Sequence, residues 1–337
     1  MRNEITGRER TAWLFTALSV LSVLKLAGLG WLYVLLGSTA AAVFFCLLDL
    51  LANGETQALP ALAKRAFGRR AGGALLLLSA LWTVLVLAST LHSAASAFPD
   101  EQVGALAVVT AAALTAIACG KGLRACAQTA GVLALLLALL YGAIGVAALH
   151  EIEPAWCAVW GGRQHAGRSF AYLLLPSCML FLPRQKQQRR LRPALVLLAV
   201  LPAIPAFLCA ACLSRGLSSM QAYPFYLLTK SLSLFSVMER FEPLLSGALL
   251  MGFVCLSMLL AQTAAEIFTA IAQNAQRGPL AIGVSAAGFA LSWCIGRLPQ
   301  RFWIWGAAIF WGAFPLLTLL IVAIKKDSEK GKKVVDK

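Results

Sequence analysis

Ionisable residues within apolar runs are the first candidates for chemistry, because each costs roughly 3 kcal/mol at a bilayer centre. Four stand within or near the ends of such runs: Lys25, Asp49, His92 and Glu266. Lys25, at mid-run, either faces an aqueous cavity or extends its stem toward the interface. We predict that Asp49 and Glu266 lie at solvated helix ends. We predict that His92 is a hydrogen-bonded structural residue, with a proton relay as the alternative.

The cysteines are the next candidates. Most of the nine lie inside apolar runs, and Cys209 and Cys212 form a CxxC pair in the middle of a predicted helix. The pair has no second CxxC and no neighbouring histidine, so we interpret the cysteines as small buried side chains. The sequence predicts no metal, redox or cofactor site.

Motifs of enzymes are missing from the sequence. It contains no HExxH, no GxSxG and no phosphate-binding loop, and Gly120-Lys121-Gly122 reads as a turn. No pair of carboxylates is predicted to face a cavity. We therefore expect a protein that is not an enzyme.

A charged stretch, "MERFEPLL" (238–245), stands directly before a long apolar run. Pro243 suits the first turn of a helix, and Glu242 just ahead of it opposes the positive end of the helix dipole. Glu239 and Arg240 need partners. One alternative is a local ion pair at a wet surface. We predict instead that Glu239, Arg240 and Glu242 form a desolvated network, which ties segment 221–237 to the following helix and sets how the outer side closes over the pocket.

The amino-acid composition indicates which kind of secondary structure carries these residues. The chain of 337 residues is 60% hydrophobic and 13% charged, with a mean hydropathy of +0.79, which indicates an integral membrane protein. The apolar runs are continuous rather than alternating, so they predict an all-α protein and not a barrel. Ten runs approach the length of a membrane span: 11–30, 31–52, 72–98, 103–120, 127–149, 168–183, 192–214, 243–270, 279–296 and 302–324.

The net charge of +15 is explained by its distribution. In a ten-span arrangement most lysines and arginines fall on one side, which predicts both termini in the cytoplasm. The distribution of basic residues therefore indicates the orientation of the chain in the membrane, and no nucleic-acid partner is predicted. Segment 221–237 is too interrupted to span and is predicted to be interfacial or re-entrant. Residues 325–337 are predicted to be a disordered, basic cytoplasmic tail, which follows one transmembrane domain at 1–324.

Ten spans divide into two halves, 11–149 and 168–324, which suits a 5+5 inverted repeat with broken first helices. Gly28 and Gly30 could unwind the first span, and Pro176 removes a backbone donor inside the sixth. The alternative is an ordinary proline kink, with the glycines in a loop.

Several features in order resemble the GerAB-type spore germination permeases. These are "MLFLP" (179–183), the basic loop "RQKQQRR" (184–190), the proline-bearing outer segment and "MERFEPLL"; "GKGLRACAQ" (120–128) and "EIEPAW" (151–156) match less sharply. The resemblance covers about residues 100–270. It departs from the family in the first span, where the break is short and lacks the usual proline, and in the sixth, where "PSC" replaces glycine and glutamate.

The resemblance implies a LeuT-like member of the amino acid/polyamine/organocation superfamily, the B subunit of a spore nutrient-germinant receptor. Such a subunit would bind a small, amino-acid-like nutrient between broken spans 1 and 6, in the inner membrane of a spore-forming bacterium. Its partners would be a membrane A subunit and a C-type lipoprotein. Carried over by position, the ligand-binding residues are Gly28, Gly30, Leu175, Pro176, Ser177, Cys178 and Met179. A secondary amino acid or amine transporter acting alone, and a structural membrane component, remain alternatives.

Overall fold

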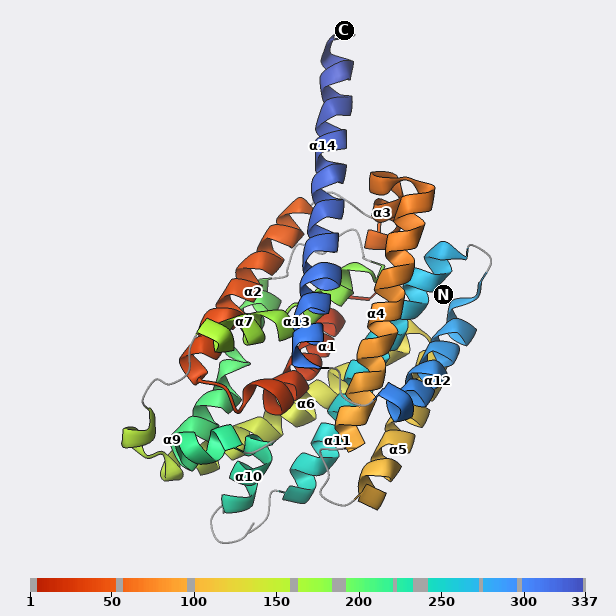
Figure 1. The fold of residues 1–337 in the computed structure, drawn as a ribbon. Helices are drawn as coiled ribbons and strands as arrows, with labels where there is room; N and C mark the ends of the chain where they lie inside the picture. Colours follow the sequence, from red (N-terminus) through yellow and green to blue (C-terminus); the bar gives the residue numbers. More distant parts are fainter. Residues whose placement is uncertain are drawn as a thin grey trace.

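The computed structural model describes residues 5–52, 57–95, 101–157, 163–183, 192–220, 223–232, 242–272, 275–295 and 299–335. Every regular element in these ranges is helical and none is a strand, which confirms the predicted all-α class (Figure 1).

The first part of the chain contains six α-helices. Their bounds are α1 Gly7–Leu21, α2 Trp31–Leu51, α3 Leu59–Phe67, α4 Arg69–Ala95, α5 Glu101–Gly120 and α6 Leu123–Ala148. A π-helical segment, Ser22–Leu26, continues α1, and short 3₁₀ turns at Leu149–Glu151 and Pro154–Cys157 follow α6.

The second part contains eight α-helices, of which several are short. They are α7 Arg163–Tyr172, α8 Arg192–Val200, α9 Ala203–Met220, α10 Pro224–Ser231, α11 Glu242–Ile271, α12 Arg277–Ile295, α13 Gln300–Gly306 and α14 Phe314–Val335. A 3₁₀ segment, Leu175–Leu180, follows α7, and a π-helical segment, Ala307–Ala313, joins α13 to α14.

Eight helical segments of the described chain are long and apolar enough to cross a membrane, so this is a multi-pass membrane protein. They are Trp31–Leu51, Arg69–Ala95, Gln102–Gly120, Leu123–Glu151, Leu195–Ser214, Leu244–Ile271, Arg277–Ile295 and Gln300–Lys326. In the two remaining predicted spans, 11–30 and 168–183, the α-helix gives way to a π-helical and to a 3₁₀ segment.

The interruptions have local causes. Thr6 and Glu9 form a capping box that starts α1. The helix then changes to π geometry at Ser22, and α2 begins at Trp31, so the break lies at the end of this span rather than in its middle. In the second case α7 stops at Tyr172 and 3₁₀ geometry follows around Pro176, which cannot donate a backbone hydrogen bond.

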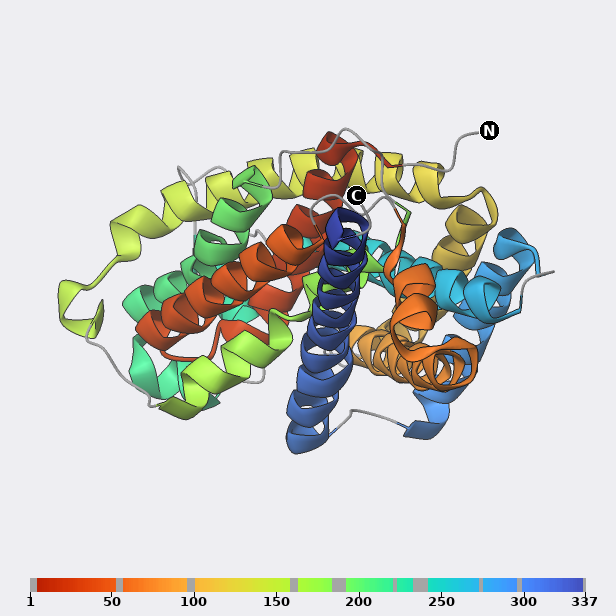
Figure 2. The ribbon, with the colours of Figure 1, turned by 90° about the horizontal axis from the view of Figure 1, so that it is seen from above.

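Two long helices, α4 and α11, form the centre of the bundle. They pack against each other and against α5 and α12, while α2 packs against α7, α8 and α9. Helix α1 lies between these groups and contacts α6, α8 and α11. In the view from above, α6 runs along one side of the molecule (Figure 2). The close contact of α1 with α11 depends on Gly252, where a Cβ atom would overlap the Val20 side chain.

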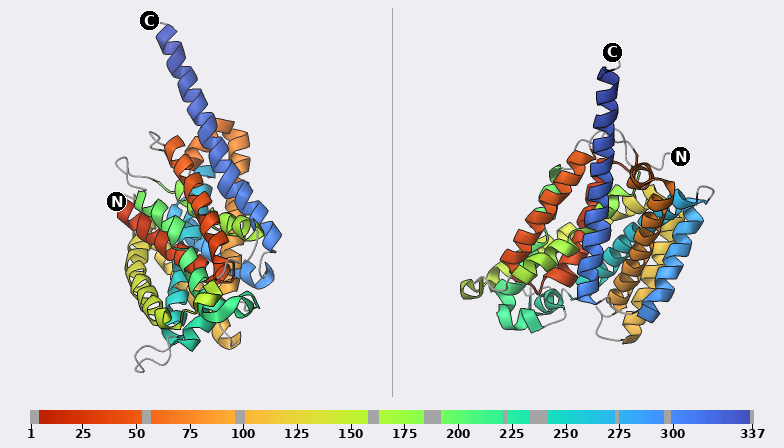
Figure 3. Two further views of the ribbon diagram at one scale, coloured as in Figure 1. Left: turned by 90° about the vertical axis from the view of Figure 1, so that its left-hand side faces the viewer. Right: turned by 45° about the horizontal axis from the view of Figure 1, so that its top comes forward.

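Three expectations differ from the structure in detail. The predicted span 192–214 is divided into α8 and α9 at Leu201 and Pro202, because proline lacks the backbone donor that a continuous helix needs. The polar stretch after α2 contains α3, a short amphipathic helix. The expected disordered tail is helical as far as Val335, and α14 projects beyond the other helices (Figures 1 and 3).

Candidate functional site

A pocket surrounds Lys25, between the π segment after α1 and helices α4, α11 and α13. One wall is polar and consists of Lys25 with the hydroxyl residues Ser89, Thr90 and Ser93 of α4. The other wall is formed by Leu21, Leu24, Phe253, Leu256 and Trp303. Of the two alternatives for Lys25, the structure therefore places its side chain in the lining of a pocket, whose other described residues are apolar or carry a hydroxyl group.

Hydrogen bonds within α4 fix how its hydroxyl groups meet Lys25. Ser93 Oγ donates to the Ser89 carbonyl at 2.8 Å, and Thr90 Oγ1 donates to the Val86 carbonyl at 2.8 Å. The hydroxyl oxygen of Ser93 therefore presents a lone pair, and it accepts from Lys25 Nζ at 3.5 Å. In this pocket α4 offers acceptors and Lys25 is the donor.

The π geometry of Ser22–Leu26 determines the position of Lys25 on the first helix. The Ala27 amide donates to the Ser22 carbonyl at 2.9 Å, which closes a turn one residue wider than an α-helical turn. The extra residue rotates the helix face that follows it. Such π turns are frequent at functional sites, and this one carries the only charged residue of the pocket lining.

Trp303 connects the pocket to an aromatic cluster. Its ring centroid lies 5.3 Å from that of Tyr172, 6.2 Å from Trp82 and 5.9 Å from Trp311. The indole N–H groups of Trp82 and Trp303 are buried and have no hydrogen-bond acceptor in the described structure. A buried donor without an acceptor lowers the stability of the folded protein. The N–H group of Trp303, a residue of the pocket lining, is such a donor.

The pocket is narrow in this conformation. Its free space is about 10 Å³, room for about one water molecule. A solute larger than water would fit only with the pocket walls further apart.

The predicted ligand-binding residues fall at two places. Leu175, Pro176, Ser177, Cys178 and Met179 are all buried in the 3₁₀ segment, and the Ser177 hydroxyl has no hydrogen-bond partner in the described structure. Gly28 lies against α9 and α10: a Cβ atom there would be 3.1 Å from the Ser218 carbonyl oxygen and 3.5 Å from Pro224 Cγ.

Two hydrogen bonds show how the interrupted helices lie together. Arg10 Nη2 near the start of α1 donates to the Met179 carbonyl at 2.9 Å, and the Gly30 amide donates to His165 Nδ1 at 3.0 Å. The two segments therefore run in opposite directions and touch near both ends, while α7 itself packs against α2. Gly28 and Gly30 lie at one end of the pair and Met179 at the other, along a helix about 25 Å long. The break at Gly28 and Gly30 and the break at Leu175–Met179 are therefore far apart and lie against different parts of the bundle.

His165 is held neutral by its surroundings. Burial, and the nearby positive charge of Arg168, lower the pKa of its imidazole below the ordinary value. The neutral ring can accept the Gly30 amide at Nδ1, whereas a protonated ring cannot.

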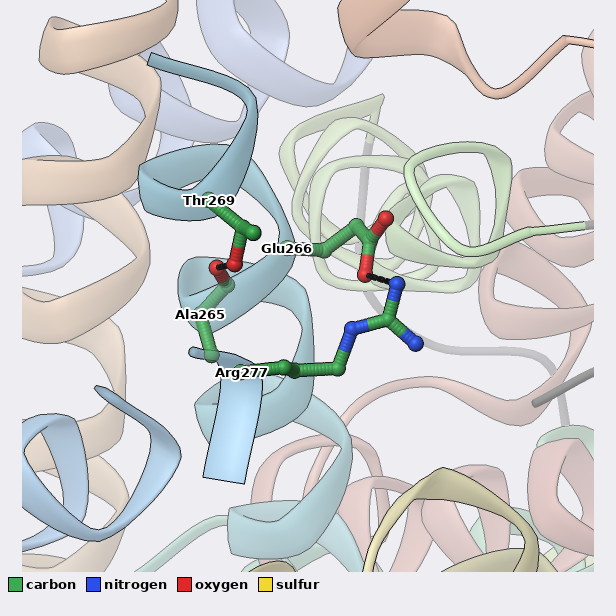
Figure 4. Close-up of polar contacts among 4 residues, drawn as sticks. All are labelled: Ala265, Glu266, Thr269 and Arg277. Atoms are coloured by element: carbon green, nitrogen blue, oxygen red, sulfur yellow. Dashed lines mark hydrogen bonds and ion pairs between the residues drawn. The ribbon is translucent and has the colours of Figure 1, made fainter. Parts of the chain in front are cut away.

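The other ionisable residues lie away from the pocket lining. Glu266, expected at a solvated end, forms an ion pair with Arg277 that joins the last turns of α11 to the start of α12 (Figure 4), and their side chains are 15% and 23% exposed. Asp49 and His92 are half-buried on α2 and α4. Glu239 and Arg240 lie outside the described residues; Glu242 begins α11, so their network remains a prediction.

The structure shows where the cysteines lie and what they contact. Within the described residues no group of three histidine, cysteine or acidic side chains could hold a metal ion. All nine cysteines are free thiols. Cys209 is buried in α9, and Cys212 donates to the Ala148 carbonyl at 3.7 Å. Cys126 accepts from Gln262, which also donates to the Cys119 carbonyl.

Sequence reasoning identified Lys25 but missed its partners. Ser89 and Ser93 are spaced by one helical turn on an apolar helix, which is a usable signal for a polar stripe. Trp303 has no such signal, because only the packing of α13 against α7, and of the Trp303 ring against Trp82 of α4, brings it to the pocket. Arg10 likewise becomes visible only through its contact with Met179.

Fold and site together define an all-α, multi-pass membrane protein with a small charged pocket beside an interrupted helix. Comparison with known proteins adds no narrower class: no family model matches the chain, and no curated protein matches it.

Proposed function

We propose that this protein binds a small nutrient solute within a ten-span, LeuT-like bundle and is the permease-type B subunit of a spore germinant receptor. Binding is relayed to an A-type membrane subunit and a C-type lipoprotein in the spore inner membrane. The chain's termini lie in the cytoplasm. The family part of this proposal rests on the resemblance of residues 100–270.

One structural observation carries the proposal. The two interrupted segments run in opposite directions and touch near both ends, through the Arg10–Met179 and Gly30–His165 hydrogen bonds. A charged pocket adjoins the interruption of the first. In transporters built from inverted repeats, solutes bind where helices of the two halves are discontinuous, so this arrangement supports solute binding over a purely structural role.

Spores provide the direct test of the receptor role. Deleting the gene should abolish the germination response to at least one nutrient of a panel, while response to a non-nutrient trigger is kept. Complementation with the parent chain should restore the response only when the A- and C-type partners are present. A deletion strain that responds normally to every nutrient would exclude the receptor role.

The alternative is a transporter that acts alone. It is favoured by the same pocket, because an occluded polar site also suits alternating access. The purified chain in vesicles should then accumulate a labelled amino acid or amine without partners. The receptor proposal predicts binding without accumulation in that assay.

A further inference from the structure

We infer that the surface formed by the end of α3, the start of α4 and the last apolar turns of α14 binds an anionic phospholipid. The lipid phosphate lies against Arg69, Arg70 and Lys325, and an acyl chain lies along the exposed face of α4. The inference goes beyond the proposed function and does not depend on it, because it concerns the outer surface of the bundle and not the pocket.

Three exposed basic side chains gather at this surface. A sharp turn at Gly68, with a φ of +83°, joins the end of α3 to Arg69 and Arg70, the first residues of α4. Lys325 of α14 donates to two backbone carbonyls in the last turn of α3, at 3.1 and 2.9 Å. The three side chains are therefore close to one another, at the end of the bundle beyond which α14 projects (Figure 1).

The positive charge of this surface has no acidic neighbour along its own helices. Residues 57–95 and 314–326 contain no aspartate or glutamate. None of the three basic side chains forms an ion pair with another described residue. The arginines also do not stabilise α4, because the first turn of a helix lies at the positive end of its dipole. An anion from outside the chain is therefore the complementary partner.

The basic side chains stand where two membrane-crossing segments end. In α4 an apolar run begins directly after Arg70, and in α14 the apolar run ends at Ile324, directly before Lys325. Basic residues next to a span lie near the phosphate groups of the lipids and are attracted to anionic headgroups. The nearest available anion is therefore the phosphate of a membrane lipid.

An exposed stripe runs along α4 from Arg70. Residues 70, 74, 77, 78 and 81 are exposed, and their spacing puts them on one face of the helix. Leu77, Leu78 and Leu81 in this stripe are 42%, 50% and 49% exposed. A basic group at the head of an apolar stripe matches the phosphate and acyl chain of a phospholipid. A free phosphate ion or an acidic protein segment would use the charges and not the leucines, so the stripe favours the lipid.

The experiment measures lipid binding to the purified full-length chain in neutral detergent. Phosphatidylglycerol and phosphatidylcholine with identical acyl chains are titrated, and bound lipid is counted by native mass spectrometry. The parent should bind phosphatidylglycerol more tightly. Arg70→Gln should weaken that binding about fivefold, the effect expected for one basic residue near an anionic surface. Arg69→Gln with Arg70→Gln should abolish the preference between the two lipids.

Matched variants separate this surface from a general effect of charge. Arg163→Gln removes an exposed arginine that lies outside the eight long apolar segments, and it should leave the lipid preference unchanged. Arg70→Lys keeps the charge and should keep most of the preference. Glycerol phosphate, which has the anion without the acyl chains, should not displace phosphatidylglycerol. Thermal unfolding without added lipid shows whether each variant is folded.

Four results would overturn the inference. They are equal binding of the two lipids to the folded parent, an unchanged preference in the folded double variant, an equal loss in Arg163→Gln, and displacement of phosphatidylglycerol by glycerol phosphate. The last result would indicate a soluble anion in place of a lipid. Nutrient response does not enter any of these measurements, so failure of the receptor proposal leaves their outcome unaffected.

Discussion

At the residue scale, His165 is the described group whose protonation most directly affects the junction of the two interrupted helices. Its imidazole accepts the Gly30 amide, and its pKa lies below the ordinary 6.5 because of burial and Arg168. The folded state therefore binds this proton less well than the unfolded state. Stability that is present above pH 6.5 is lost as the pH falls from that value through the lowered pKa.

Replacing His165 with asparagine tests this reasoning. The Asn Oδ1 atom can accept from the Gly30 amide but does not titrate. We expect the thermal unfolding midpoint of the parent to fall more steeply between pH 7.5 and 5.5 than that of His165→Asn. Parallel pH profiles would show that the Gly30 contact does not contribute to acid sensitivity.

The Glu266–Arg277 ion pair gives a second prediction at this scale. Its two side chains are largely buried, so removing one partner leaves the other charge poorly solvated. Arg277→Met should lower stability by about 1.5–3 kcal/mol, and Glu266→Gln added to it should recover part of the loss. The measurement is thermal or denaturant unfolding of the three variants; additive losses in the double variant would indicate that the pair is not coupled.

At the element scale, close helix contacts depend on small residues. A Cβ atom on Gly37 of α2 would overlap Ser169 Oγ and approach the Ala166 carbonyl oxygen to 2.5 Å, both in α7. Gly37→Ala should therefore force α2 and α7 apart and destabilise the fold by about 1–3 kcal/mol. Gly142→Ala in α6 is the control, because nothing lies within 4 Å of its added atom. Equal unfolding midpoints for the two variants would refute the packing argument.

The elements also show what can be predicted from a sequence of this kind. Apolar length located α2, α4, α5, α6, α11 and α12 to within a few residues, because a helix that crosses lipid must keep every backbone group bonded internally. Pro176 lies in the 3₁₀ segment that follows α7, which ends at Tyr172; the sequence alone left a helix break and a simple kink as alternatives there. The π segments, by contrast, leave no compositional trace, and α3 is too short to stand out. The pocket partners of Lys25 come from three other elements, whose packing no local pattern encodes.

At the scale of the whole molecule, basic residues from distant parts of the sequence lie near one another. Lys325 of α14 donates to the carbonyls of Arg65 and Ala66 at 3.1 and 2.9 Å, and so satisfies the C-terminal end of α3. Lys64 of α3 donates to the Ala270 carbonyl at the end of α11. Basic segments far apart in sequence thus share one end of the bundle, while α10 lies at the other (Figure 1). The positive-inside rule predicts that this basic end is cytoplasmic.

Thiol labelling of intact cells tests the orientation. In a chain freed of its native cysteines, a single cysteine at position 230 in α10 or at 165 should react with an impermeant reagent added outside. A cysteine at position 121 or 326 should react only after the membrane is permeabilised. Two further positions lie outside the described residues: a cysteine at position 100 should react from outside, and a cysteine at position 190 should react only after permeabilisation. Outside labelling at 121 would invert the topology.

The narrow pocket around Lys25 limits how fast a solute can associate with it. With room for about one water molecule, the site admits a solute only during the fraction of time in which its walls are apart, and the observed affinity is weakened by that fraction. Association should then level off at high solute concentration, at the frequency of spontaneous opening, instead of rising in proportion to collisions. If the protein senses a nutrient as proposed, such a pocket makes it insensitive to brief encounters and responsive to a solute that persists.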